Sequence, residues 1–354
     1  MSFYQLLQYG VGDLKALIRK AESPSEKRRR IAALWVKNIL CILFALVFIG
    51  GYSALFGSEN SAAGVVIFCI LLTVRFVDFG YDVPSSLWAL PLSFAIMTFG
   101  PVLAAAGSPL FAFAVNGLCI LTLLLLTSMR PAYGNQGLYV FGYLLLQGFP
   151  VAENSLFLRI LAMSIGCLLC CLVFYRAHRE KTYALSGVES LKQFRLTSPV
   201  SRWQLKMALG ISLVLLLGQI FRLPKTMWLG ISCMSVLQME AEVVKERLYG
   251  RVPFVLLGSL LFGLLSPLCP AALFPLFGIV GGLCVGFCGS YRWKSLFNCF
   301  GALAPATLLY GAGSAVLLRI LLNFCGAVFA FLFYHFFDKA LRLSLPTGKD
   351  RVSA

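Results

Sequence analysis

Long apolar runs recur along the whole chain, and they limit its fold more than any other feature. Six lie in each half, near 35–56, 61–77, 86–105, 109–127, 136–150 and 155–175, and then near 205–221, 226–241, 252–266, 269–288, 295–312 and 315–337. Runs of this kind approach the length that crosses a bilayer as a helix, which pairs every backbone polar group within lipid. A mean hydropathy of +0.85 also excludes an ordinary soluble domain. We therefore predict an all-α polytopic membrane protein with about twelve transmembrane helices.

The basic residues are distributed unevenly about this topology. Of the 30 Lys and Arg residues, 26 fall on one side, and the other four are Arg159, Arg222, Lys225 and Arg319. The positive-inside rule places the basic side in the cytoplasm, together with both termini. We therefore expect a multi-pass protein of the bacterial cytoplasmic membrane. The net charge of +16 then reflects topology and attraction to anionic lipids, with no nucleic acid as partner.

A short motif occurs once in each half. Leu-Arg-Ile-Leu stands at 158–161 and again at 318–321, and each Arg is followed seven residues later by a glycine. An arginine at the start of an apolar segment is costly in lipid and is seldom incidental. With an even number of spans per half, the two halves share one orientation. We expect two parallel six-helix repeats, an arrangement typical of transporters.

These features divide the chain into five segments. They are a basic amphipathic N-terminal segment at 1–33, a first repeat at 34–178, a cytoplasmic linker at 179–203, a second repeat at 204–340, and a cytoplasmic tail at 341–354. Two alternatives remain for the N-terminal segment. It forms an interfacial helix on the cytoplasmic leaflet, or a solvated helix that packs on a partner subunit.

The second half carries a series of diffuse motifs. They are Lys206-Met207-Ala208-Leu209-Gly210, Leu217-Gly218-Gln219, Trp228, Val236-Leu237-Gln238, Arg247, and Arg251 with Gly258. This pattern resembles the fusaric-acid-resistance family of aromatic acid exporter-like membrane proteins. The resemblance covers about 204–340 well and 34–178 weakly. It implies proton-driven export of aromatic carboxylic acids or related organic anions.

The chain departs from that family in two ways. The linker and tail are too short for the large cytoplasmic domains that many members carry, so a separate cytoplasmic partner or a homo-oligomer stays open. The first half has Leu72-Thr73-Val74-Arg75 where Val-Leu-Gln is expected. Both departures leave the substrate and its regulation open.

Four residues within the spans are candidates for substrate binding. Arg159 and Arg319 could form bidentate pairs with a carboxylate, and Gln147 and Gln238 could line its path. The alternatives are that each arginine anchors at the outer headgroups and that each amide joins neighbouring helices.

Four carboxylates are candidates for proton coupling. Asp78 with Asp82, and Glu240 with Glu242, lie in mixed-charge clusters at the cytoplasmic ends of the second and eighth spans. Asp78 and Asp82 share one helical face if the helix continues through them. A carboxylate in a partly dry site could have a raised pKa and carry protons. The alternative is an ion-paired loop that fixes the helix ends.

Signatures of enzymes and cofactors are missing from the sequence. There is no phosphate-binding loop, the two histidines are His178 and His335, and nearly all twelve cysteines lie inside apolar runs. We expect a transporter that is not an enzyme and needs neither cofactor nor metal. A passive anion channel and a non-transporting membrane scaffold are the alternative functions.

Overall fold

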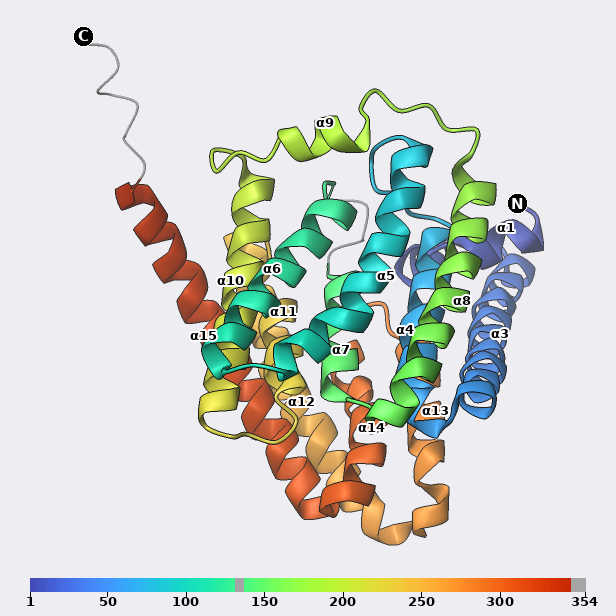
Figure 1. Cartoon of the computed structure of the whole chain (residues 1–354). Coiled ribbons are helices and arrows are strands. Elements are labelled where there is room, and N and C mark those ends of the chain that lie inside the picture. Colours follow the sequence, from blue (N-terminus) through green and yellow to red (C-terminus); the bar gives the residue numbers. More distant parts are fainter. Residues whose placement is uncertain (131–136, 345–354) are drawn as a thin grey trace. The chain divides into compact units, whose positions relative to one another are not determined.

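The computed structural model describes residues 1–130 and 137–344, and within them it contains helices and no strands (Figure 1). The α-helices are α1 (Phe3–Gln8), α2 (Val11–Arg19), α3 (Pro24–Phe56), α4 (Ser61–Val74), α5 (Val83–Ala105), α6 (Pro109–Thr127), α7 (Leu138–Gly148), α8 (Glu153–His178), α9 (Gly187–Lys192), α10 (Pro199–Ile220), α11 (Met227–Val236), α12 (Ala241–Leu265), α13 (Phe274–Phe287), α14 (Tyr291–Tyr310) and α15 (Ala312–Ser344). Short 3₁₀ turns precede α4 at Ser58–Asn60 and precede α13 at Ser266–Leu268 and Ala271–Leu273.

Each of the twelve predicted apolar runs coincides with one of these helices. Within the described residues, seven helices are long and apolar enough to cross a membrane. Four more apolar helices are shorter, among them α7 with 11 residues and α11 with 10. The predicted all-helical, multi-pass membrane fold is confirmed. The count of twelve crossings and the two six-helix repeats stay predictions.

Helix α12 begins earlier than the hydropathy pattern indicated. We placed its charged N-terminal residues in a loop before a span at 252–266, but the helix already begins at Ala241. Glu, Lys and Arg are good helix formers, and Glu242 in the first turn is favoured by the helix dipole. Arg251 therefore lies inside the helix, where it is buried.

The contacts of the chain group it into two compact units. Unit 1 contains residues 1–51 and 246–324, and unit 2 contains residues 52–245 and 325–354. Each unit takes residues from both sequence halves. The predicted division at 179–203 is untested, and most of the predicted tail lies outside the described residues.

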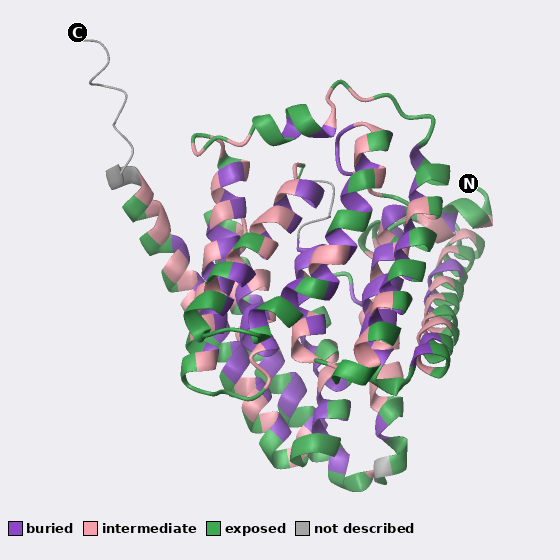
Figure 2. Cartoon of the chain, viewed as in Figure 1, coloured by how far each residue is buried: buried purple, intermediate pink, exposed green. Residues whose placement is uncertain are grey.

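In unit 1, the N-terminal helices pack on their own chain. Leu6 of α1 and Leu14 of α2 are buried against Ala33 and Leu34 of α3. This contact uses the apolar face that we had assigned to lipid or to a partner subunit. Much of the rest of α3 is exposed or intermediate, whereas most of the apolar stretch of α10, in unit 2, is buried (Figure 2).

In unit 2, α8 lies beside α4 and α5 (Figure 1). A Cβ added at Gly166 of α8 would lie 2.4 Å from Cδ1 of Ile67 in α4. A Cβ at Gly326 of α15 would lie 2.5 Å from the carbonyl oxygen of Leu229 in α11. Each glycine of the repeated Arg-x6-Gly motif thus allows close approach of two helices.

Candidate functional site

Arg159 of α8 is buried in unit 2, with 3% of its surface exposed. Its guanidinium donates three hydrogen bonds, from Nε to Asn60 Oδ1 (2.9 Å), from Nη1 to the carbonyl of Phe149 (2.6 Å) and from Nη2 to the carbonyl of Glu59 (2.9 Å). All three acceptors are neutral. Among the described residues, no carboxylate forms an ion pair with Arg159 at 4.0 Å or less. The side chain is therefore directed into the unit.

Arg159 lines a cavity of about 300 Å³ in unit 2. Gln147 of α7 lines the same cavity, so two of the four predicted substrate-binding residues lie together. The other lining residues come from α5, α7, the α7–α8 connection, α10 and the α10–α11 loop: Thr98, Pro101, Val102, Ala105, Leu146, Pro150, Val151, Gln219 and Thr226. Apolar walls with a few polar groups and one buried cation fit a small amphipathic anion.

A set of hydrogen bonds holds Gln147 in place. Asn116 Oδ1 accepts from the Tyr143 hydroxyl (2.6 Å) and from Gln147 Nε2 (3.2 Å). Oε1 of Gln147 is buried and has no partner among the described residues. A buried acceptor without a partner is costly, so this amide has hydrogen-bonding capacity left for a ligand or a water molecule.

A second cation lies next to the cavity. Nζ of Lys225 is 4.4 Å from the ring centroid of Phe149, the residue whose carbonyl accepts from Arg159. Burial lowers the pKa of Lys225 below its ordinary value. Lys225 and Arg222 have φ values of 53° and 50°, and they are the non-glycine residues with positive φ in the described chain. Such backbone strain is frequent at functional sites.

Arg319 of α15 has different neighbours, in unit 1. It is 5% exposed and lies within electrostatic range of Arg251 and Cys299. Asn323 connects the two arginines: its Nδ2 donates to the carbonyl of Arg319 (2.8 Å) and its Oδ1 accepts from Nη2 of Arg251 (2.8 Å). Arg251 also donates to the Tyr291 hydroxyl at 3.3 Å.

Gln238 does not join Arg159 and Gln147 at the cavity. It lies between α11 and α12, where its Nε2 donates to the carbonyl of Ser235 at 3.3 Å. The roles of all four residues in substrate binding stay predictions.

Asp78 and Asp82 do not share a helical face, because α4 ends at Val74 and α5 begins at Val83. Asp78 forms an ion pair with Lys181 (2.9 Å). Partial burial acts to raise the pKa of Asp78, but the hydrogen bond and charge of Lys181 outweigh it and lower the pKa. Asp82 caps α5 by accepting from Ser85 N (3.1 Å) and also accepts from Gly187 N (3.0 Å). These bonds outweigh desolvation and lower its pKa.

Glu240 and Glu242 are exposed at the start of α12. Glu242 forms an ion pair with Lys245 at 3.1 Å, between side chains that are both largely in solvent. Exposed pairs of this kind contribute little to stability. The proton-coupling role of all four carboxylates stays a prediction.

Sequence reasoning missed two charged or polar contacts that the fold brings together. Asn60 is the partner of Arg159 from 99 residues away, and the only sequence signal is a polar Glu-Asn pair between two apolar runs. Lys206 of α10 is buried beside Asp338 of α15 (2.7 Å), and its Nζ lies 3.6 Å from the ring centroid of Tyr334. No spacing in the sequence predicts this pair.

Within the described residues, no group of three or more His, Cys, Asp or Glu side chains could hold a metal ion. No curated protein and no solved structure matches the chain. A family described as fusaric acid resistance protein-like matches residues 212–333, which include most of the motifs from which we inferred the resemblance. The inferred resemblance is thereby confirmed. Over about a third of its length, this multi-pass membrane protein is similar to the fusaric acid resistance protein-like family.

Proposed function

We propose that this protein exports small organic anions, and aromatic carboxylates in particular, through the cavity beside Arg159. The family match and the apolar helices point to transport or efflux across a membrane. The observation that carries the choice of substrate is the buried guanidinium of Arg159, which has neutral hydrogen-bond partners. The Glu59 carboxylate lies within electrostatic range of this guanidinium, but the effect of burial outweighs it. Burying an arginine is costly, and an arriving carboxylate offsets that cost.

The hydrogen-bonding capacity of Arg159 supports this role. A guanidinium has five N–H donors, and the three hydrogen bonds described above leave two for a ligand. Two N–H groups can hold one carboxylate by a bidentate pair. Gln147 and Thr98, on the wall of the same cavity, add polar groups near this position.

The size and lining of the cavity support a small substrate with an apolar body. About 300 Å³ lies at the lower end of the range for ligand pockets, which runs from about 300 to 1,000 Å³. Proline, valine, leucine and alanine side chains form most of the wall. A carboxylate on a single ring fits this combination better than a large or strongly polar anion.

The charge distribution supports export. Arg159, Arg222 and Lys225 are three of the four basic residues that the predicted topology places on the outer side. Arg159 lines the cavity and Lys225 lies next to it, so the exceptions to the charge bias gather where an anion would leave. We propose both termini in the cytoplasm and a bacterial cytoplasmic membrane on the same grounds.

We further propose coupling to protons, with Glu240 and Glu242 as better candidates than Asp78 and Asp82. The two aspartates are tied to Lys181, Ser85 and Gly187, and their lowered pKa values keep them ionised near neutral pH. Glu240 and Glu242 are exposed at the start of α12, where protons reach them directly from solvent. A passive channel would need none of these carboxylates.

The test is substrate-driven proton movement in proteoliposomes. A pH gradient is imposed, and its collapse is followed after addition of aromatic and aliphatic monocarboxylates, with protein-free vesicles correcting for leakage of neutral acids. Wild type should give saturable collapse, and Arg159→Gln should lose it. Arg176→Gln is the matched control, because Arg176 is an exposed arginine on the same helix.

Three results would change the proposal. Unaltered rate and affinity in well-folded Arg159→Gln would overturn the substrate site. Anion current under voltage without proton movement would favour a channel. Neither response in the wild type would favour a scaffold.

A further inference from the structure

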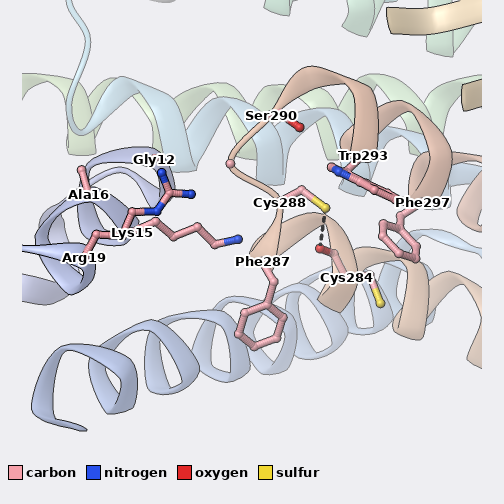
Figure 3. Close-up of a pocket in the computed structure, with 11 residues that line it drawn as sticks. Gly12, Lys15, Ala16, Arg19, Cys284, Phe287, Cys288, Ser290, Trp293 and Phe297 are labelled. Carbon is pink, nitrogen blue, oxygen red and sulfur yellow. Dashed lines mark hydrogen bonds between the residues drawn. The ribbon is translucent and has the colours of Figure 1, made fainter. Parts of the chain in front are cut away.

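A second cavity lies in unit 1, apart from the residues discussed so far. It has a volume of about 640 Å³ and lies between α2 and the turn that joins α13 to α14 (Figure 3). Lys15 and Arg19 extend toward it from α2, and Cys284, Phe287, Trp293 and Phe297 line it from α13 and α14 (Figure 3). The cavity therefore has a basic side and an apolar side.

The basic side carries more than one charge. Lys15 and Arg19 line the cavity, and both Lys15 and Lys294 lie within electrostatic range of Cys288 in its wall. None of the described residues that line it is acidic. A site with several cations and no internal carboxylate favours an anion.

The apolar side is largely aromatic. The indole of Trp293 is half exposed and stacks edge-on against Phe254, with ring centroids 5.3 Å apart. The ring of Phe287 packs against the indole of Trp35 in α3, with the ring centroids 4.5 Å apart. Tryptophan is enriched where hydrocarbon meets headgroups, so this wall suits an acyl chain better than water.

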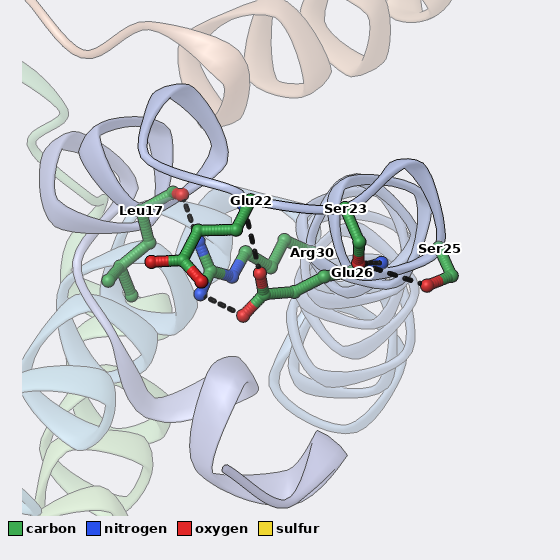
Figure 4. Close-up of polar contacts among 6 residues, drawn as sticks. All are labelled: Leu17, Glu22, Ser23, Ser25, Glu26 and Arg30. Atoms are coloured by element: carbon green, nitrogen blue, oxygen red, sulfur yellow. Dashed lines mark hydrogen bonds and ion pairs between the residues drawn. The ribbon is translucent and has the colours of Figure 1, made fainter.

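Helix α2 is held in position by contacts with α3. Arg30 donates to the carbonyl of Leu17 near the C-terminal end of α2 and forms an ion pair with Glu26 (Figure 4). Lys37 donates to the carbonyl of Tyr9, just before α2. Leu14 of α2 is fully buried against α3. Together these contacts set the orientation of α2 and so the position of Lys15.

We propose that this cavity binds one anionic phospholipid, with its phosphate between Lys15 and Arg19 and the start of an acyl chain along Trp293 and Phe297. The lining favours a phospholipid over a free phosphate, because a free phosphate would make no contact with the aromatic wall. The predicted topology places these basic residues at the cytoplasmic leaflet, where anionic lipids attract them. The lipid site does not depend on the proposed transport activity.

The test is lipid binding to the full-length protein in detergent, measured by native mass spectrometry. The probes are phosphatidylglycerol, phosphatidylcholine with the same acyl chains, and glycerol 3-phosphate as a headgroup without chains. Two variants address the two sides of the site. Lys15→Gln with Arg19→Gln removes the charges, and Gly12→Leu fills the cavity, because a Cβ at Gly12 meets no atom within 4 Å.

The matched control is Arg28→Gln with Arg29→Gln, which removes the same charge from two exposed residues outside the lining. We expect wild type to bind phosphatidylglycerol at least tenfold more tightly than phosphatidylcholine. The charge variant should weaken phosphatidylglycerol binding by about 30-fold, as two basic residues near a lipid surface imply. Gly12→Leu should also weaken it, and the control should bind as wild type does.

Several results would overturn the proposal. One is equal binding of the two lipids, and another is wild-type affinity in both the charge variant and Gly12→Leu. A third is displacement of the lipid by equimolar glycerol 3-phosphate, which would assign the site to a free phosphate ester. If the charge variant does not fold, as judged by its thermal melt, Gly12→Leu decides the result alone.

Discussion

Arg159 and Arg319 occupy matching positions in the two sequence halves, yet their surroundings differ. Arg159 is held by neutral oxygens from Glu59, Asn60 and Phe149, and it lines a cavity. Arg319 is buried near a second arginine, Arg251, to which Asn323 connects it. The repeated motif therefore gives a buried guanidinium in each half, but the groups that surround the two guanidiniums differ. One arrangement leaves the charge facing space for an anion, and the other joins two cations within the packing of helices.

The comparison is most sharply tested by neutralising each arginine. Charge-assisted hydrogen bonds contribute about 1.5–3 kcal/mol, so Arg159→Gln should lower kcat/KM for carboxylate transport by about 10- to 100-fold. Arg319→Gln should change kcat/KM by less than about threefold. Both values come from initial rates in proteoliposomes, with reconstituted protein quantified for each variant. Equal losses would mean that the two arginines serve one substrate path.

Removing the asparagine partner of each arginine separates stability from binding. Asn60→Ala leaves Nε of Arg159 without its acceptor, which should cost about 1–3 kcal/mol and raise KM. Asn323→Ala removes the oxygen that accepts from Nη2 of Arg251 and should cost a similar amount of stability at unchanged KM. Thermal melts and transport kinetics on the same preparations give both quantities. A raised KM in Asn323→Ala would contradict the distinction.

The glycines that follow the two arginines should also respond differently. Gly326→Ala places a Cβ 2.5 Å from a backbone oxygen of Leu229, which cannot move alone, and should cost about 1–3 kcal/mol. Gly166→Ala places a Cβ 2.4, 2.6 and 2.8 Å from Cδ1, Cγ1 and Cγ2 of Ile67, which are side-chain atoms, and should cost less. Adding Ile67→Val, which removes Cδ1, should restore part of the loss. Chemical denaturation measures the free energy of unfolding of each variant. A larger loss for Gly166→Ala than for Gly326→Ala would contradict the expected order.

The smallest expected effect is a pH dependence of anion binding. Burial lowers the pKa of Lys225, so its charge is present at low pH and is lost as the pH rises through a value below 10.5. Carboxylate affinity should weaken by about fivefold over that range, as expected for loss of one partly exposed charge. Lys225→Arg should abolish the decline, whereas Arg319→Gln should keep it. Binding measured by calorimetry between neutral and alkaline pH would show whether Lys225 acts with Arg159.

Much of the fold follows from the sequence, because lipid leaves a chain few ways to pair its backbone. All twelve apolar runs correspond to helices, but hydropathy misplaced the start of α12. There half of the residues from Glu242 to Arg251 are charged. Glu, Lys and Arg lower the hydropathy of this stretch although they are good helix formers.

The candidate site was less predictable than the fold. Arg159 and Gln147 stand out in the sequence as polar residues in apolar runs. Their place on one cavity wall depends on the packing of α5, α7, α8 and α10, which no spacing encodes. For Asp78 and Asp82, the i,i+4 spacing suggested a shared helical face, but α4 ends before either residue.

Phe149 gives the site beside Arg159 a property that neither cation has alone. Its carbonyl accepts from Arg159 and its ring faces Lys225, and it directly follows the last residue of α7. We therefore expect that an anion drawing either cation toward itself would also displace the end of α7, and through it the other cation. In a transporter with this site, substrate binding and a shift of α7 would be coupled through one residue.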